Sequence, residues 1–149
     1  RPESQGNCIQ PYKSANDAFS EFPCADTTKT RAFLKIQDGC NQFCTYCIIP
    51  FSRGRCRSMT LERLKQEVDQ LAEQGFREIV LTGINLGFFG MDTGCDIADA
   101  VAVCAENPQI LRVRLGSLEP ERMTAEILAR LAACEKFCPQ FHLSLQSGQ

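Results

Sequence analysis

Short apolar runs and helical repeats alternate along this sequence, and the alternation limits how the chain can fold. Strand-like runs at 32–37, 78–82, 111–115 and 141–145 are separated by segments whose apolar residues recur at a helical period. Such alternation predicts parallel strands joined by right-handed crossover connections. We therefore expect an α/β fold in β-α-β-α-β-α-β order.

The three helical segments have recognisable ends. Thr60, Asp96 and Thr124 stand directly before them and are residue types that commonly cap a helix. Gly75 is placed to end the first helix, and Pro108 follows the second. The sequence therefore predicts helices that begin at about 61, 97 and 125.

The number of predicted elements falls short of a closed barrel. A barrel of alternating strands and helices takes about 250 residues, and the sequence ends soon after the fourth run. We expect residues 30–149 to be the N-terminal part of a truncated barrel domain, poorly soluble because its fourth strand has an open edge. Residues 1–29 contain three prolines and are predicted to be a linker or extended lead-in.

Cysteine is the unusual component, with 10 residues against one histidine and no tryptophan. Disulfide-dense domains are usually short and secreted, and the first residues lack the apolar core of a signal peptide. We therefore expect reduced cysteines and a cytoplasmic location.

No apolar run approaches the roughly 20 residues that span a bilayer, so we expect no membrane partner. The net charge of -2 gives no bulk reason to bind nucleic acid.

Cys40, Cys44 and Cys47 lie together in the loop after the first strand. Parallel α/β folds place their sites at the C-terminal ends of strands. Three thiolates on one turn can bind three irons of a cubane cluster and leave the fourth iron open. A structural zinc site usually needs four ligands, for which Cys56 is the nearby candidate. The spacing favours an iron–sulfur cluster, and a non-catalytic zinc or electron-transfer module is the alternative.

The CxxxCxxC motif, with Tyr46 just before its last cysteine, resembles the signature of radical S-adenosylmethionine (SAM) enzymes. The surrounding sequence is similar to the methylthiotransferase branch of these enzymes, and most similar to the tRNA threonylcarbamoyladenosine methylthiotransferases. The segments that carry this resemblance are 31–41, 47–50, 53–54, 81–87, 112–120 and 142–148.

The resemblance implies a partial radical SAM (β/α) barrel in which Cys40, Cys44 and Cys47 hold a 4Fe–4S cluster. SAM would bind the open iron through its amino and carboxylate groups. An electron from the cluster would cleave SAM to methionine and a 5′-deoxyadenosyl radical. The radical would abstract hydrogen from threonylcarbamoyladenosine next to the tRNA anticodon, where a methylthio group is inserted. The implied partners are tRNA and an electron donor such as flavodoxin or ferredoxin.

The same resemblance implies contacts to SAM. Tyr46 would pack beside the adenine. Thr82, Gly83 and Ile84 would lie where the backbone of the family receives the SAM amino group. Further candidates for the pocket follow the third and fourth strands: Ser117, Glu119 and Gln146.

Family members also carry an N-terminal domain with an auxiliary 4Fe–4S cluster, the rest of the barrel and a C-terminal RNA-binding module. These parts are missing from the 149 residues, so we expect the isolated chain to be inactive. A ribosomal-protein methylthiotransferase or another radical SAM enzyme is the alternative activity. No role is assigned to Cys8, Cys24, Cys56, Cys95 and Cys138.

Three further features have simple structural interpretations. Cys104 and Cys134 lie in helical patterns and are predicted to be small buried hydrophobic residues. Arg112 and Arg114 share one face of a strand, where an inward-facing pair would need anionic partners. His142 is predicted to be a polar residue on a strand face rather than a ligand.

Overall fold

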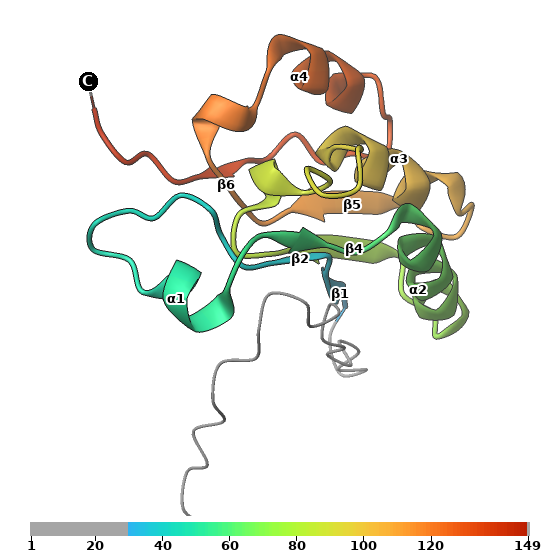
Figure 1. Cartoon of the computed structure of the whole chain (residues 1–149). Helices are drawn as coiled ribbons and strands as arrows, with labels where there is room; N and C mark the ends of the chain where they lie inside the picture. Colours follow the sequence, from blue (N-terminus) through green and yellow to red (C-terminus); the bar gives the residue numbers. More distant parts are fainter. Residues whose placement is uncertain (1–29, 149) are drawn as a thin grey trace, which may run out of the picture.

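The computed structural model describes residues 30–148, and its centre is a parallel sheet. Strands β1 (Ala32–Lys35), β4 (Glu78–Thr82) and β5 (Arg112–Leu115) pair in the order β1-β4-β5. The predicted parallel α/β architecture is confirmed (Figure 1). The predicted linker at 1–29, with Cys8 and Cys24, lies outside the described residues.

The predicted strand at 141–145 is wrong in its extent. Only β7 (His142–Leu143) is a strand, and it pairs in parallel with β6 (Ser117–Leu118). Upstream, the chain makes an isolated bridge between Phe137 and β5. Beyond this bridge the Gln140 N–H donates to the Cys138 carbonyl oxygen at 2.7 Å instead of to β5, so the pairing stops.

Three helices connect the strands, and their predicted N-caps are confirmed. They are α2 (Leu61–Glu73), α3 (Ile97–Glu106) and α4 (Ala125–Ala132). The side chains of Thr60, Asp96 and Thr124 each accept a hydrogen bond from a backbone N–H in the first turn. Gly75, at φ +94°, follows the last turn of α2 as predicted.

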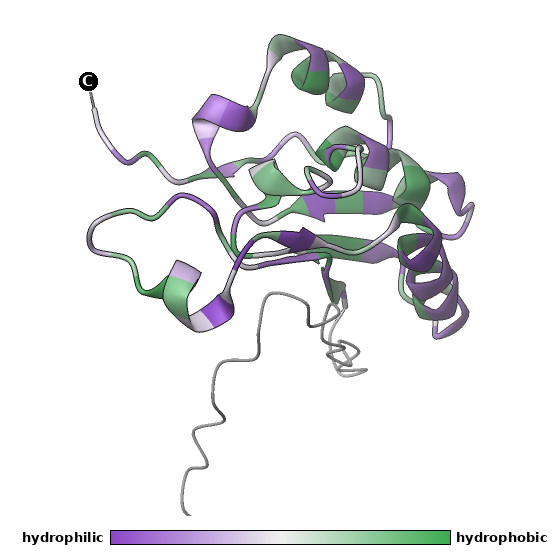
Figure 2. Cartoon of the chain, in the orientation of Figure 1, coloured by the Kyte–Doolittle hydropathy of each residue, from purple (hydrophilic) through white to green (hydrophobic). Residues whose placement is uncertain are grey.

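The helices cover one face of the sheet and form the core with it. Alternate strand residues, such as Leu34, Ile79 and Val113, are buried toward this side. Helix α3 packs against α2, α4 and β5. The outer side of α2 is hydrophilic (Figure 2), whereas Leu64 and Val68 of the same helix are buried. No helix in the described part of the chain is long and apolar enough to cross a membrane.

The other face of the sheet carries Arg112 and Arg114, as the two-residue period predicts. The Arg114 Nε donates to Glu78 Oε1 at 2.6 Å, and Arg31 Nε lies 3.6 Å from the same oxygen. Glu78 begins β4, so these ion pairs lie at the end of the sheet opposite the cysteine loop. Arg114 therefore has an anionic partner at the end of the sheet away from the cysteine loop.

The cysteine-bearing segment contains more secondary structure than the loop that the sequence predicts after the first strand. Its base is closed by the antiparallel pair β2 (Gln37–Asp38) and β3 (Arg57–Ser58). Helix α1 (Ile49–Arg53) follows the three cysteines. The predicted strand at 32–37 is therefore divided into β1 and β2. Two short 3-10 helices, η1 (Leu86–Phe88) and η2 (Pro120–Arg122), follow β4 and β6.

Candidate functional site

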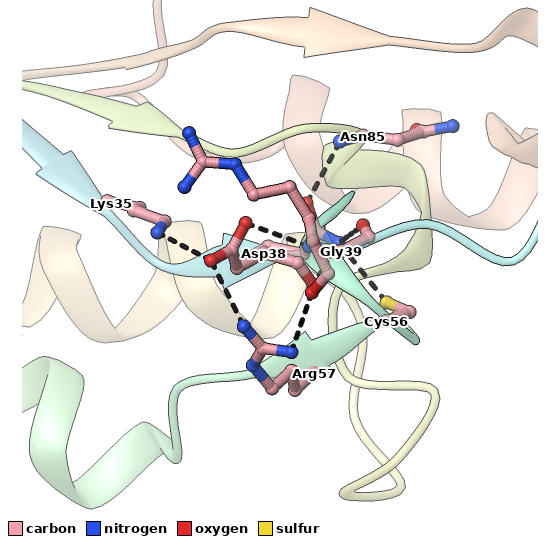
Figure 3. A network of polar contacts seen from close by, with 8 residues as sticks. Lys35, Asp38, Gly39, Cys56, Arg57 and Asn85 are labelled. Carbon is pink, nitrogen blue, oxygen red and sulfur yellow. Dashed lines mark hydrogen bonds and ion pairs between the residues drawn. The ribbon is translucent and has the colours of Figure 1, made fainter. Parts of the chain in front are cut away.

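A buried glutamine stands at the base of the cysteine loop. Gln37 is fully buried, and its Nε2 donates to the carbonyl oxygens of Gly39 (2.7 Å) and Asp38 (3.1 Å) and to Cys56 Sγ (3.2 Å). Its Oε1 accepts from the backbone N–H of Asn85 at 2.9 Å. One side chain thus connects both ends of the cysteine loop to the turn after β4, and Figure 3 labels its partners Gly39, Cys56 and Asn85.

Asp38 is the buried charge of this network. Its Oδ2 accepts from Lys35 Nζ (2.8 Å) and Arg57 Nη2 (3.3 Å), and its Oδ1 accepts from the Gly39 N–H (2.9 Å). Burial opposes ionisation, but the Lys35 and Gly39 hydrogen bonds and the two cations outweigh it and lower the pKa of Asp38. The carboxylate therefore holds β2 and β3 together in its charged form.

The first turn of the cysteine loop depends on a glycine. Gly39 has φ +73°, and a Cβ on it would lie 2.1 Å from the carbonyl oxygen of Arg55. The next residue, Cys40, donates its N–H to the carbonyl oxygen of Gly54 at 3.1 Å. The two ends of the loop are thus in direct backbone contact, and a side chain at position 39 would prevent this contact.

The three predicted ligands face a common cleft. Cys40 is buried, whereas Cys44 and Cys47 are partly exposed. Burial raises the pKa of the Cys40 thiol, and the nearby Glu119 carboxylate and the other two thiols oppose its ionisation further. A bound metal would reverse this balance, because coordination deprotonates a thiol.

The cleft has a volume of about 160 Å³ and lies between the cysteine loop and the turns after β4, β6 and β7. Figure 1 shows the α1-bearing loop and the segment after β7 on the same side of the sheet. The cleft is lined by Cys40, Gln42, Cys44, Tyr46, Cys47, Ile49, Ile84, Asn85, Glu119, Ser144 and Gln146. A neighbouring cavity of about 440 Å³ shares five of these residues and adds Pro120, Glu121, Leu145 and Ser147.

Four of the seven predicted SAM contacts lie in this cleft. Tyr46, Ile84, Glu119 and Gln146 line it together with the cysteines. The Tyr46 hydroxyl donates to Gln146 Oε1, which links the cysteine loop to the segment after β7. The structure therefore brings into contact two residues that are 100 positions apart in sequence.

The other three predicted contacts are not in the cleft lining. Thr82 is paired with Lys35 in the sheet, and Ser117 is paired with His142 in β6 and β7. A Cβ on Gly83 would lie 2.8 Å from Gln37 Oε1, so this glycine makes room for the buried glutamine.

Three polar residues of the lining were not predicted: Gln42, Asn85 and Ser144. Gln42 Nε2 donates to Glu119 Oε2 at 2.9 Å and to Glu121 Oε1 at 2.5 Å. Its position between two motif cysteines is a signal that was available in the sequence. Asn85 directly follows the predicted contact segment 82–84, which is a similar signal. Ser144 could not be placed without the course of the chain after β7.

Cys56 is directed away from the cleft. Its Sγ accepts from Gln37 Nε2 and donates to the Phe88 carbonyl oxygen at 3.5 Å, and burial raises the pKa of its thiol. Within residues 30–148, no three His, Cys, Asp or Glu side chains gather closely enough to hold a single metal ion. The described conformation therefore does not form the alternative four-cysteine zinc site.

Cys104, Cys134 and His142 can be compared with their predicted surroundings. Cys104 is fully buried on α3, where burial raises its pKa to about 12. Cys134 is partly buried and packs against the core. The prediction of a small buried hydrophobic residue is thus confirmed for Cys104 and holds in part for Cys134. His142 is exposed on β7.

Fold and site together define a parallel β/α protein with a cysteine-lined cleft at the C-terminal ends of its strands. The sequence profile of the Radical SAM superfamily matches residues 34–149. The chain belongs to this superfamily.

Named relatives give a narrower comparison. The chain is 44% identical over 118 residues to the threonylcarbamoyladenosine tRNA methylthiotransferase MtaB of Aquifex aeolicus, covering 79% of this chain and 29% of the relative. It is 41% identical over 121 residues to MtaB of Thermotoga maritima, covering 80% and 28%. A tRNA-2-methylthio-N(6)-dimethylallyladenosine synthase of Clostridium botulinum is 36% identical over 135 residues, covering 89% and 30%. The chain thus spans about a third of the length of these relatives.

A solved structure supports the fold. The radical S-adenosylmethionine methyltransferase TsrM from Kitasatospora setae, solved with cobalamin and a [4Fe-4S] cluster, superposes with a TM-score of 0.55. The match covers 75% of this chain and 22% of that structure, at 21% identity. It therefore supports the shared (β/α) architecture alone.

Proposed function

We propose that this chain is the cluster- and SAM-binding part of a radical SAM tRNA methylthiotransferase, with residues 30–149 as the first part of its core domain. The observation that carries the proposal is the position of the three motif cysteines. Cys40, Cys44 and Cys47 line one cleft above the C-terminal ends of parallel strands, next to residues that follow β4, β6 and β7. Parallel β/α folds bind their ligands at this edge.

The donor set suits a 4Fe–4S cluster. Cys40, Cys44 and Cys47 each supply one thiolate, which leaves one iron free for SAM. A bound cluster would provide the electron that cleaves SAM. Cys40 is anchored through its own N–H to Gly54 and by the Gln37 network at the adjacent residue Gly39. This chain therefore holds Cys40, the first ligand, on a turn that is fixed by hydrogen bonds.

The SAM site is the remainder of the cleft. Tyr46, Ile84, Glu119 and Gln146 line it, and Tyr46 and Gln146 already contact one another across it. The neighbouring 440 Å³ cavity, with Glu121 and Ser147 in its lining, offers room for the nucleoside that is modified. Thr82, Gly83 and Ser117 support these positions from outside the lining.

The proposed substrate is threonylcarbamoyladenosine in tRNA. Similarity to MtaB proteins from two organisms supports this choice, at 44% and 41% identity. Dimethylallyladenosine in tRNA is the second candidate, supported by the 36% identity to the Clostridium botulinum synthase. We assign three further roles to regions beyond the part that this chain covers in its relatives. They are contacts to tRNA, ligands of an auxiliary cluster, and docking of a flavodoxin or ferredoxin. A tRNA substrate supports the cytoplasmic location that we propose.

Electron paramagnetic resonance on the anaerobically reconstituted, dithionite-reduced chain tests the cofactor site. We expect a reduced 4Fe–4S signal that changes when SAM is added. Cys44→Ala should abolish the signal, and Cys56→Ala, the matched control, should retain it. A signal that is lost in Cys56→Ala and indifferent to SAM would instead support the four-cysteine module.

Mass spectrometry of tRNA nucleosides tests the substrate. Deleting the gene that encodes this chain should remove the methylthio group from threonylcarbamoyladenosine and leave methylthiolated dimethylallyladenosine unchanged. The reverse pattern would support the second candidate. Unchanged tRNA in both respects would contradict the tRNA assignment and favour a ribosomal-protein substrate.

A further inference from the structure

The amide nitrogen of Asn85 is buried without a hydrogen-bond partner. Asn85 is only 4% exposed, and its Nδ2 is one of two buried side-chain polar atoms in the described residues that lack a partner. The same residue lines the cleft that contains the three motif cysteines. Buried polar groups are nearly always satisfied, so an orphan donor at a cleft indicates a missing acceptor.

The rest of the Asn85 residue is fixed. Its Oδ1 accepts from the Gly87 N–H at 3.1 Å, and its own N–H donates to Gln37 Oε1 at 2.9 Å. Rotating the amide by 180° would place an NH2 group against the Gly87 N–H, which is also a donor. The orientation with Nδ2 free is therefore the one that the backbone requires. In Figure 3 the Asn85 side chain extends away from the polar network at the loop base.

Resting on the function proposed above, we propose that Asn85 Nδ2 donates a hydrogen bond to an acceptor atom of SAM. SAM carries such acceptors on its carboxylate, its ribose and its adenine. Gln37 is the positioning residue in this arrangement, because its Oε1 fixes the Asn85 backbone while its Nε2 holds Gly39 beside the first cysteine. The cleft thereby gains a specific polar contact from the turn after β4.

Asn85→Asp isolates the proposed contact. The substituted carboxylate keeps an oxygen for the Gly87 N–H and the size of the side chain, but replaces the donor by an acceptor. Asn41→Asp is the matched control. Asn41 is exposed in the same loop region, its Oδ1 also accepts a backbone N–H, from Cys56 at 3.1 Å, and it is not in the cleft lining. Both variants add one negative charge near the proposed cluster.

The measurement is the dissociation constant of SAM for the reconstituted full chain, by equilibrium dialysis, together with the SAM-induced change in the electron paramagnetic resonance spectrum. Loss of a buried hydrogen bond, with a repelling oxygen in its place, should weaken SAM binding by about tenfold or more in Asn85→Asp. Asn41→Asp should change it less than about twofold. Iron content and melting temperature should be retained in both variants.

The outcomes separate the inference from the function on which it rests. If the unaltered chain binds SAM and Asn85→Asp binds it equally well, the Asn85 contact is wrong and the proposed function stands. If the unaltered chain does not bind SAM, both fail. A fall in melting temperature with unchanged SAM affinity would assign Asn85 to η1 capping alone and overturn the inference.

Competition with methionine and with 5′-deoxyadenosine identifies the half of SAM that carries the acceptor. The acceptor atom belongs to the compound whose binding is weaker in Asn85→Asp than in the unaltered chain. Unchanged competition by both compounds would again contradict the proposed contact.

Discussion

The buried side chain of Gln37 and the backbone of Asn85 are joined by a 2.9 Å hydrogen bond that links the cysteine loop to the turn after β4. The same glutamine donates to Gly39 O at the loop base. One side-chain amide therefore connects two parts of the chain that are 48 positions apart in sequence. A change in the position of the cysteine loop relative to β4 would break this connection.

Gln37→Ala should destabilise the fold and reduce cluster loading. The substitution leaves the Asn85 N–H and the Gly39 carbonyl without their buried partner, at about 1–3 kcal/mol for each unsatisfied group. We expect the free energy of unfolding in urea to fall by roughly 2–4 kcal/mol. Gln74→Ala, at the exposed end of α2, is the control and should change it by less than about 0.5 kcal/mol. Equal stability of the two variants would contradict the bracing role of Gln37.

Gly39→Ala should be more damaging than Gly75→Ala. Both glycines have positive φ, +73° and +94° respectively, so alanine is strained at either position. A Cβ at position 39 would lie 2.1 Å from Arg55 O, whereas a Cβ at position 75 would meet nothing within 4 Å. We expect a cost of about 1 kcal/mol for Gly75→Ala. Gly39→Ala should cost more and should lower the iron bound per chain after reconstitution. Normal iron loading of Gly39→Ala would show that the loop tolerates the displacement.

The helices were predictable because their signals are local. Thr60, Asp96 and Thr124 cap the helices that they precede, and each cap involves residues no more than three positions away. The strand β4 was predicted with its observed bounds, because a short apolar run in the centre of a parallel sheet has few alternatives.

The cysteine loop was less predictable because its order comes from contacts between distant residues. The pairing of Gln37 with Ser58 depends on a loop that returns after about 20 residues, and no local pattern announces it. The shortness of β7 was not predictable either, because the Gln140 N–H turns back to the Cys138 carbonyl oxygen and no sequence pattern indicates this turn. The position of Asn85 beside residues 82–84 is visible in the sequence, but its unpartnered nitrogen is a property of the folded cleft.

Ionisation of Cys104 should reduce stability above pH 9. Burial raises the pKa of this thiol in the folded chain from 9.0 to about 12. The unfolded chain therefore releases the proton first as the pH rises, so the contribution is complete below pH 9 and is lost between 9 and about 12. At pH 10 the expected loss is roughly 1 kcal/mol in the free energy of unfolding.

Urea denaturation under reducing, anaerobic conditions between pH 7 and pH 10 measures this slope. Cys104→Ala should unfold at lower urea throughout, because it leaves a cavity, but should lose less stability between the two pH values. Val101→Ala is the control, because it shortens a buried side chain of the same helix without removing a thiol, and its pH dependence should match that of the unaltered chain. An unchanged slope in Cys104→Ala would show that other groups cause the alkaline loss.

Arg114→Ala should leave SAM binding intact. Arg114 pairs with Glu78 at the start of β4, and the opposite ends of the strands lead to the cysteine-lined cleft. Removing this partly exposed ion pair should cost about 1 kcal/mol or less in unfolding free energy. The dissociation constant of SAM should change by less than about twofold, because no charge within the cleft is altered. Arg112→Ala, on the same sheet face, should behave alike. A tenfold loss of SAM affinity in Arg114→Ala, with stability retained, would mean that the charge on this face of the sheet acts on the cleft.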